Sequence, residues 1–132
     1  MTTNEAKNES AKRWMEKAFD ALDNASGTVQ SHPAGSINRS YYACFYAASA
    51  VLILDGRHFV KHAGVRSALH QHLVHTGRIP VEIGEAYNAL METRQEADYT
   101  ESVSWTPQKA QNALEAATRI VSAMKALLPP NL

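Results

Sequence analysis

Seven polar or aromatic side chains stand where the packing of a simple helical protein would not require them. They lie in three short stretches of the chain: Arg39 and Tyr42; Lys61 and His62; and Arg94, Asp98 and Tyr99. Arginine can bind phosphate oxygens through paired hydrogen bonds, and histidine changes its charge near neutral pH. Each residue has an ordinary structural explanation when it is taken alone. Arg94 and Asp98, for example, are spaced as an ion pair within one helix. It is their occurrence together that calls for a functional explanation.

Histidines offer a second kind of chemistry, which is metal binding. His58 and His62 are four residues apart, and His72 and His75 are three apart, so either pair could share a helix face. A zinc site normally needs three or four ligands, and nothing completes either pair at a recognised spacing. We therefore expect solvated or locally hydrogen-bonded histidines, with no metal and no cofactor.

Nucleophilic and nucleotide-cofactor enzymes find little support in the sequence. Cys44 lies on the apolar side of a predicted buried helix, where a thiol normally serves only as packing. No Gly-x-Ser-x-Gly elbow, phosphate-binding glycine loop or dinucleotide fingerprint occurs. These enzyme classes are excluded at the level of motifs.

Length and composition predict one domain, residues 1–132, in a reducing compartment. Apolar residues make up 45% of the chain, and Cys44 is its single cysteine. The longest apolar stretch, residues 41–54, is shorter than the roughly 20 residues that a membrane-spanning helix needs. No signal peptide is evident at the start of the chain. We expect a soluble cytoplasmic protein.

Charge is balanced overall but unevenly distributed. There are 13 basic and 13 acidic residues, so the strongly basic composition of many nucleic-acid-binding proteins is absent. Residues 56–78 carry four basic side chains and no acid, whereas residues 79–101 carry six acids and one base. The two segments could pair with each other inside the fold, or the first could form a basic binding strip.

Apolar periodicity predicts an all-α protein, an antiparallel bundle of four to five helices. The helices are expected at about residues 5–25, from residue 37 toward Gly56, at 62–76, at 81–97, and from Pro107 to the stop at Pro129. Ser36 and Thr106 are predicted N-caps of the second and last helices. Longer loops are expected at residues 27–36 and 99–105. On the second helix, Ser49 is placed on the polar side and Tyr41 on the apolar side.

Three sequence blocks resemble the signatures of the HEPN family of prokaryotic helical domains. Residues 38–47 read N-R-S-Y-Y-A-C-F-Y-A and resemble the family's N-R-x-Y-Y-A-x-F-x-A. Residues 61–65 are similar to its K-H-x-G-V element, and residues 94–99 to its R-x-x-A-D-Y element. The blocks follow family order and spacing, and the resemblance covers about residues 10–125. It implies a four- or five-helix bundle that often forms homodimers. Many members are encoded beside a minimal nucleotidyltransferase, in toxin–antitoxin or defence pairs.

One departure from the family pattern bears on activity. Active HEPN ribonucleases carry an arginine followed, after four to six residues, by a histidine, whereas here Tyr99 follows Arg94 after four residues. A phenol with a pKa near 10 is poorly suited to proton transfer at neutral pH. Arg66 and His72 match the spacing by letter, but a regular helix would place them about 120° apart. The resemblance therefore implies binding without efficient ribonuclease activity.

The favoured hypothesis is a HEPN module that binds a nucleotide or RNA. Arg39, Lys61 and Arg94 would supply charge for phosphate, and Asp98 would orient Arg94. Tyr42 and Tyr99 could stack on a base or bond a sugar, and His62 would add a pH-sensitive donor. The expected partners are a second copy of the chain and a minimal nucleotidyltransferase.

The sequence leaves two alternatives open. One is a metal-independent endoribonuclease toxin that uses Arg94 or Arg66 with a noncanonical partner residue, with Tyr99 as the other catalytic candidate. The other is a purely structural bundle that docks a partner protein and binds no nucleotide.

Overall fold

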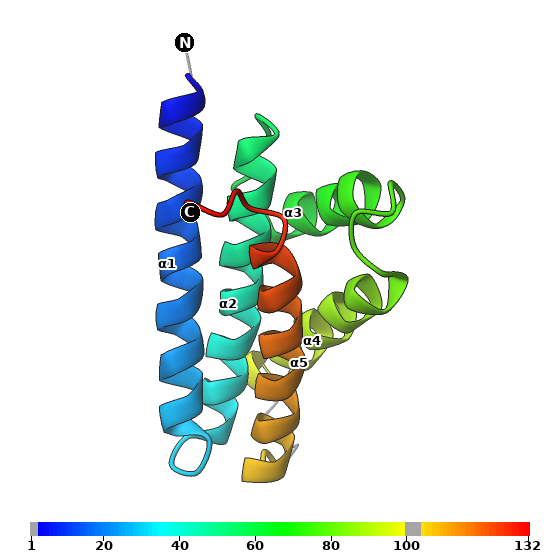
Figure 1. Ribbon diagram of the computed structural model, residues 1–132. Coiled ribbons are helices and arrows are strands. Elements are labelled where there is room, and N and C mark those ends of the chain that lie inside the picture. Colours follow the sequence, from blue (N-terminus) through cyan, green and yellow to red (C-terminus); the bar gives the residue numbers. More distant parts are fainter. Residues whose placement is uncertain (1–2, 100–103) are drawn as a thin grey trace.

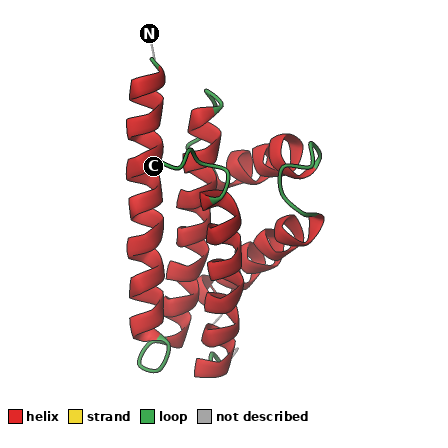
Figure 2. Ribbon diagram, viewed as in Figure 1, coloured by secondary structure: helices red, strands yellow, loops and turns green. Residues whose placement is uncertain are grey.

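The protein is described here by a computed structural model that covers residues 3–99 and 104–132. Every regular element in these two ranges is helical (Figure 2). In chain order, the elements are α1 (Asn4–Thr28), α2 (Pro33–Leu54), α3 (His62–Leu69), η1 (His70–Val74), α4 (Val81–Tyr99) and α5 (Pro107–Lys125). The all-helical bundle predicted from the sequence is confirmed.

Helices α1, α2 and α5 lie side by side, and α3, η1 and α4 extend from them on one side (Figure 1). Helix α2 returns antiparallel to α1, whereas α5 runs in the same direction as α2. Helix α2 contacts α1, α3, α4 and α5 and is the centre of the bundle. None of the described helices is long and apolar enough to cross a membrane.

Helix α1 packs on α2 through small side chains. Thr3 caps its start, because its hydroxyl oxygen accepts a hydrogen bond from the Ala6 amide at 3.1 Å. Its buried residues are alanines apart from one methionine, and they are Ala11, Met15, Ala18, Ala21 and Ala25. Because the distance between packed helices depends on the side chains at their contact, this face brings α1 and α2 close together.

The start of α2 differs from the sequence prediction. The helix begins at Pro33 rather than near residue 37, because proline is well suited to a first turn that needs no N–H donor. Ser36 is therefore not an N-cap: it is buried within the helix, and its hydroxyl donates to the Ala25 carbonyl at 2.7 Å. The expected loop at residues 27–36 shrinks to residues 29–32.

The middle of α2 is buried more completely than its amphipathic pattern indicated. The expected apolar arc is buried, as predicted: Tyr41, Cys44, Phe45, Ala48, Val51 and Leu52. Ser49 was expected on the polar side but is also buried, because neighbouring helices cover α2 on several sides. Its hydroxyl is satisfied within the helix by donating to the Phe45 carbonyl at 2.8 Å.

The predicted third helix, residues 62–76, is divided into α3 and the π-helical turn η1. The His75 amide donates to the His70 carbonyl at 2.9 Å, which is the wider spacing of a π-helix. This turn packs on α4 at Gly84, and the His70 ring forms a 2.9 Å hydrogen bond with the Asn88 side chain. Gly77 adopts a positive φ of 77° just beyond the turn, in agreement with its predicted role as a stop.

The last two helices agree closely with the prediction. Helix α4 extends two residues beyond the expected end at residue 97, to Tyr99. Thr106 caps α5 as predicted, since its hydroxyl oxygen accepts from the Lys109 amide at 3.2 Å, and Pro107 follows in the first turn. Much of the expected loop at residues 99–105 lies outside the described residues.

Gly84→Ala tests the packing of η1 on α4. A Cβ at this position would lie 2.8 Å from atoms of both His70 and Val74, so we expect a loss of about 1–3 kcal/mol in unfolding free energy. Urea unfolding would measure it. Gly27→Ala is the matched control, because nothing lies within 4 Å of its Cβ and alanine favours the helix. Equal stability of the two variants would contradict the tight contact at Gly84.

Candidate functional site

The centre of the candidate site is a buried arginine. Arg94 of α4 is only 6% exposed, and its guanidinium carbon lies 4.6 Å from the centre of the Tyr41 ring on α2. Its hydrogen bond to the Asp98 carboxylate, one turn along α4, is long at 3.4 Å. The buried Nε has no hydrogen-bond partner among the described residues. Since a guanidinium offers five N–H donors, this group has donor capacity that the surrounding residues do not use.

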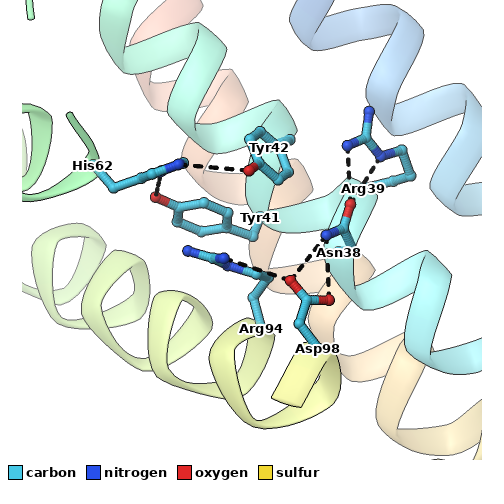
Figure 3. Close-up of polar contacts among 7 residues, drawn as sticks. All are labelled: Asn38, Arg39, Tyr41, Tyr42, His62, Arg94 and Asp98. Carbon is cyan, nitrogen blue, oxygen red and sulfur yellow. Dashed lines mark hydrogen bonds and ion pairs between the residues drawn. The ribbon is translucent and has the colours of Figure 1, made fainter. Parts of the chain in front are cut away.

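Asp98 is held in place by the start of α2. The Asn38 amide donates to both Asp98 carboxylate oxygens, at 3.1 and 3.3 Å. Arg39 in turn donates to the side-chain oxygen Oδ1 of Asn38 at 2.9 and 3.1 Å, and its guanidinium lies 4.9 Å from the Tyr42 ring centre. Figure 3 shows this chain of contacts from Arg39 through Asn38 and Asp98 to Arg94. The chain ties the beginning of α2 to the end of α4.

His62, the first residue of α3, completes the other side of the site. Its Nδ1 lies 2.7 Å from the Tyr41 hydroxyl, and its Nε2 lies 3.5 Å from the Tyr42 hydroxyl. The ring also packs on Phe45, with 4.6 Å between ring centres. In Figure 3 the Arg94 guanidinium extends beneath the Tyr41 ring toward the side where His62 lies. Aromatic rings therefore line the site, and the Arg94 guanidinium supplies positive charge to it.

Burial and the arginine charge set the protonation states here. Burial, followed by the positive charge of Arg94, lowers the pKa of His62. Burial raises the pKa of Tyr41, so its phenol keeps its proton at neutral pH. A neutral imidazole and a protonated phenol can share the short hydrogen bond, with one donating and the other accepting. The site therefore presents Arg94 as its permanent charge and His62 as a neutral group.

The structure brings together five of the seven residues singled out from the sequence. Tyr42, His62, Arg94 and Asp98 surround the site, and Arg39 joins it through Asn38. The other two lie at its margin. Tyr99 is 79% exposed, and Lys61 is exposed just before His62.

Three contributors were not among the predicted site residues: Asn38, Tyr41 and Phe45. All lie within the first block that resembles the family signature, which is the signal that could have found them. Tyr41 was placed in the apolar arc, and it is fully buried there. Its hydroxyl and its ring face nevertheless serve the site.

Other residues considered from the sequence take no part in this site. Cys44 is fully buried, and burial raises the pKa of its thiol. Within residues 3–99 and 104–132, no three His, Cys, Asp or Glu side chains gather as a metal site would require. The ion pairs of this part of the chain join Arg13 to Glu9, Arg78 to Asp55 and Arg94 to Asp98. None of them links the basic segment 56–78 to the acidic segment 79–101, so pairing of these segments is not observed.

Comparison with known proteins identifies the family of this chain. Residues 11–127 match the HEPN domain, a range that includes all three sequence blocks and the whole site. The chain belongs to the HEPN family. A UPF0332 protein of Thermotoga maritima is 34% identical over 116 residues, which cover 87% of this chain and 88% of that protein.

Two further relatives extend the comparison. The Methanocaldococcus jannaschii protein named "Putative toxin MJ0142" is 28% identical over 101 residues, covering 76% of this chain and 69% of its own length. The crystal structure of TT1696 from Thermus thermophilus has the same fold, with a TM-score of 0.77 at 21% identity. That match covers 89% of this HEPN chain and 98% of TT1696.

The histidine environment can be tested by titration. Arg94→Met keeps apolar volume beside Tyr41 but removes the positive charge, so the lowered pKa of His62 should move back toward its ordinary value of 6.5. Proton NMR of the imidazole ring against pH would measure the change. Arg119→Met, an exposed arginine of α5, is the control and should leave the His62 pKa unaltered.

The sign of the linked stability change follows from the same shift. Because the folded-state pKa of His62 is lowered, the unfolded chain binds the extra proton more readily. His62 therefore destabilises the fold progressively as pH falls below about 6.5 and through its folded pKa. A His62→Asn variant should lack this part of the pH dependence in urea unfolding. A wild-type His62 that titrates above 6.5 would contradict the described surroundings.

Proposed function

We propose that this HEPN protein is a binding module for RNA or a nucleotide in a toxin-type system, and that the ligand is held through a phosphate. The observation that carries the proposal is Arg94, a buried guanidinium whose Nε has no hydrogen-bond partner among the described residues. A buried N–H group without a partner costs about 1–3 kcal/mol, and more where the group is charged. A phosphate oxygen that reached the guanidinium would offset part of this cost.

The surroundings of Arg94 favour an anionic ligand over a neutral one. Asp98 is its one described carboxylate partner, at the long distance of 3.4 Å, and Asn38 shares that carboxylate. The Asp98 charge is therefore spread over several donors, and Arg94 keeps much of its positive potential. The Tyr42 ring, whose centre lies 5.8 Å from the Arg94 guanidinium carbon, offers a partly exposed surface for a base.

Binding without efficient cleavage is the form of the proposal that the side chains support best. Tyr99 follows Arg94 after four residues, where an active HEPN ribonuclease can carry its histidine. This tyrosine is largely exposed, and a phenol is poorly suited to proton transfer at neutral pH. His62 faces the hydroxyl groups of Tyr41 and Tyr42 with both ring nitrogens. Its exchange of a proton with RNA would first require one of these contacts to open.

The proposed partners follow from the family and its relatives. A second copy of the chain and a minimal nucleotidyltransferase are the partners that the HEPN resemblance implies. The M. jannaschii relative carries the name "Putative toxin", which supports a role in a toxin-type system. A bundle that only docks its partner would bind no nucleotide, so the binding test below separates these roles.

One observation favours the endoribonuclease as a second candidate function. His62 lies beside Arg94, and its lowered pKa keeps the imidazole neutral at physiological pH, as a general base requires. The pair would then supply a base from α3 and a phosphate-stabilising charge from α4, in place of an arginine and histidine on one helix. The sequence left open a ribonuclease in which Arg94 acts with a noncanonical partner residue. His62 is the candidate for that residue.

Arg94→Met should weaken binding of a fluorescent single-stranded RNA by about tenfold or more, because charged hydrogen bonds are each worth about 1.5–3 kcal/mol. Fluorescence anisotropy would measure the affinity. Arg119→Met removes the same charge from the surface of α5 and should bind nearly as the wild type does. Circular dichroism would establish that both variants are folded. Equal affinity for wild type and Arg94→Met would remove Arg94 from the proposed site.

A cleavage assay separates the two candidate functions. The wild-type protein, incubated with mixed-sequence RNA in EDTA, should yield no more fragments than Arg94→Met does. RNA fragments that disappear in both Arg94→Met and His62→Asn would instead establish the ribonuclease and identify its two residues. Wild-type protein that neither binds nor cleaves RNA or nucleotide would leave the partner-docking bundle as the function.

A further inference from the structure

A row of aromatic rings leads away from the Arg94 site along the contact between α2 and α1. It begins at His62 and Tyr42, whose ring centres are 5.5 Å apart. Tyr46 follows at 5.8 Å from Tyr42, and Trp14 of α1 lies 5.8 Å from Tyr46. All four side chains are partly exposed. The row thus connects the site to a second region of the surface, in small and nearly equal steps.

Basic side chains accompany these rings. The Lys17 ammonium nitrogen lies 4.6 Å from the Tyr46 ring centre and 4.8 Å from that of Trp14. Arg39 lies over Tyr42 at 4.9 Å, on the way from Lys17 to the buried Arg94. A cation therefore lies over each of the rings of Tyr42, Tyr46 and Trp14.

Tyr46, Lys17 and Arg39 also border a surface groove of about 290 Å³ between α1 and α2. Its lining consists of Lys17, Asp20, Ala21, Asn24, Arg39 and Tyr46. Two cations against one carboxylate give the groove a net positive charge, although the whole chain is neutral. Ala21 is the one small side chain that α1 contributes to this lining. This charge suits an anionic chain that continues outward from the phosphate site.

We propose that this row of rings and the adjoining groove form a track for single-stranded RNA, which begins at Arg94 and ends at Lys17. The inference rests on the proposed function, because the first phosphate is the one held at Arg94. Unpaired bases stack on aromatic side chains, and the connecting phosphates pair with cations beside them. A paired duplex hides the faces of its bases, and a mononucleotide is too short to reach Lys17. Single-stranded RNA is therefore the ligand that uses the whole surface.

Lys17 plays two parts along this track. Without ligand, its ammonium covers the Tyr46 and Trp14 rings and limits the contact of these aromatic surfaces with water. The side chain is exposed and flexible, so it can turn from the rings to an arriving phosphate. That movement would leave the Tyr46 ring free for a base. Arg39 is more restricted, because it donates two hydrogen bonds to Asn38.

The test compares two lysines of the same helix. Lys17→Gln removes the cation at the end of the track, whereas Lys12→Gln removes an exposed cation of α1 that does not line the groove. Affinities of both variants and wild type would be measured for a dinucleotide and for single-stranded RNA of about eight nucleotides, over a range of salt concentrations. For the longer RNA, Lys17→Gln should make the negative slope of log affinity against log salt shallower by about 0.7. This corresponds to a loss of about fivefold at about 0.1 M salt.

The two oligonucleotides separate this inference from the function on which it rests. Dinucleotide binding should be the same in wild type and both lysine variants, because that ligand reaches only the Arg94 site. Tyr46→Leu should weaken the longer RNA alone, by about fivefold or more. If wild type binds both RNAs and Lys17→Gln behaves as Lys12→Gln does with each, the track is wrong and the Arg94 site stands. If wild type binds neither RNA, the proposed function fails and the track fails with it.

Discussion

The placement of a permanent charge inside the bundle is the constraint on which the rest of this structure depends. An arginine cannot lose its proton, and removing it from water is costly unless other groups compensate. Here the face of the Tyr41 ring and the carboxylate of Asp98 supply that compensation. Tyr41 of α2 must lie close to the guanidinium, and Asn38 of α2 bonds Asp98, so α2 and α4 are held in one relative position.

The same requirement draws α3 into the arrangement. The Tyr41 ring packs on the Arg94 guanidinium of α4, and its hydroxyl forms a hydrogen bond with His62 of α3. One buried side chain of α2 therefore joins this helix to both α3 and α4. Asn38 and Arg39 extend the network to the start of α2. Three stretches that are distant in the sequence thus meet because each satisfies a polar group of another.

Much of the fold was predictable because local signals are strong in this chain. Apolar periodicity located the helices, and Thr106 and Gly77 marked boundaries that depend only on nearby residues. The features that were predicted wrongly are ones that tertiary contacts decide. Ser36 has the chemistry of a helix cap, but its hydroxyl is used by the Ala25 carbonyl of α1. The π-helical turn at residues 70–74 accompanies packing against Gly84, which periodicity along one helix cannot reveal.

The candidate site was predictable in part, for a related reason. Residue chemistry and motif order pointed to Arg94, Asp98 and His62, which the fold brings together. The apolar pattern of α2 assigns Tyr41 to the core, where it is fully buried. Its hydrogen bond to His62, 21 residues away in the sequence, depends on tertiary packing and could not be predicted from that pattern. Tyr99 shares a motif with Arg94, but the helix carries its side chain outward into solvent. Neighbours in sequence need not be neighbours in a site.

The alanine face of α1 has a consequence for how this surface can change during evolution. The separation of α1 and α2 is set by side chains such as Ala18 and Ala21, and the first of these is completely buried. The same separation fixes how far Lys17 and Trp14 stand from Tyr46. A larger residue in place of Ala18 would therefore widen the gap between the Trp14 and Tyr46 rings and alter recognition without replacing any residue that lines the groove. Substitutions in the buried contact between α1 and α2 would thus change ligand specificity at the surface.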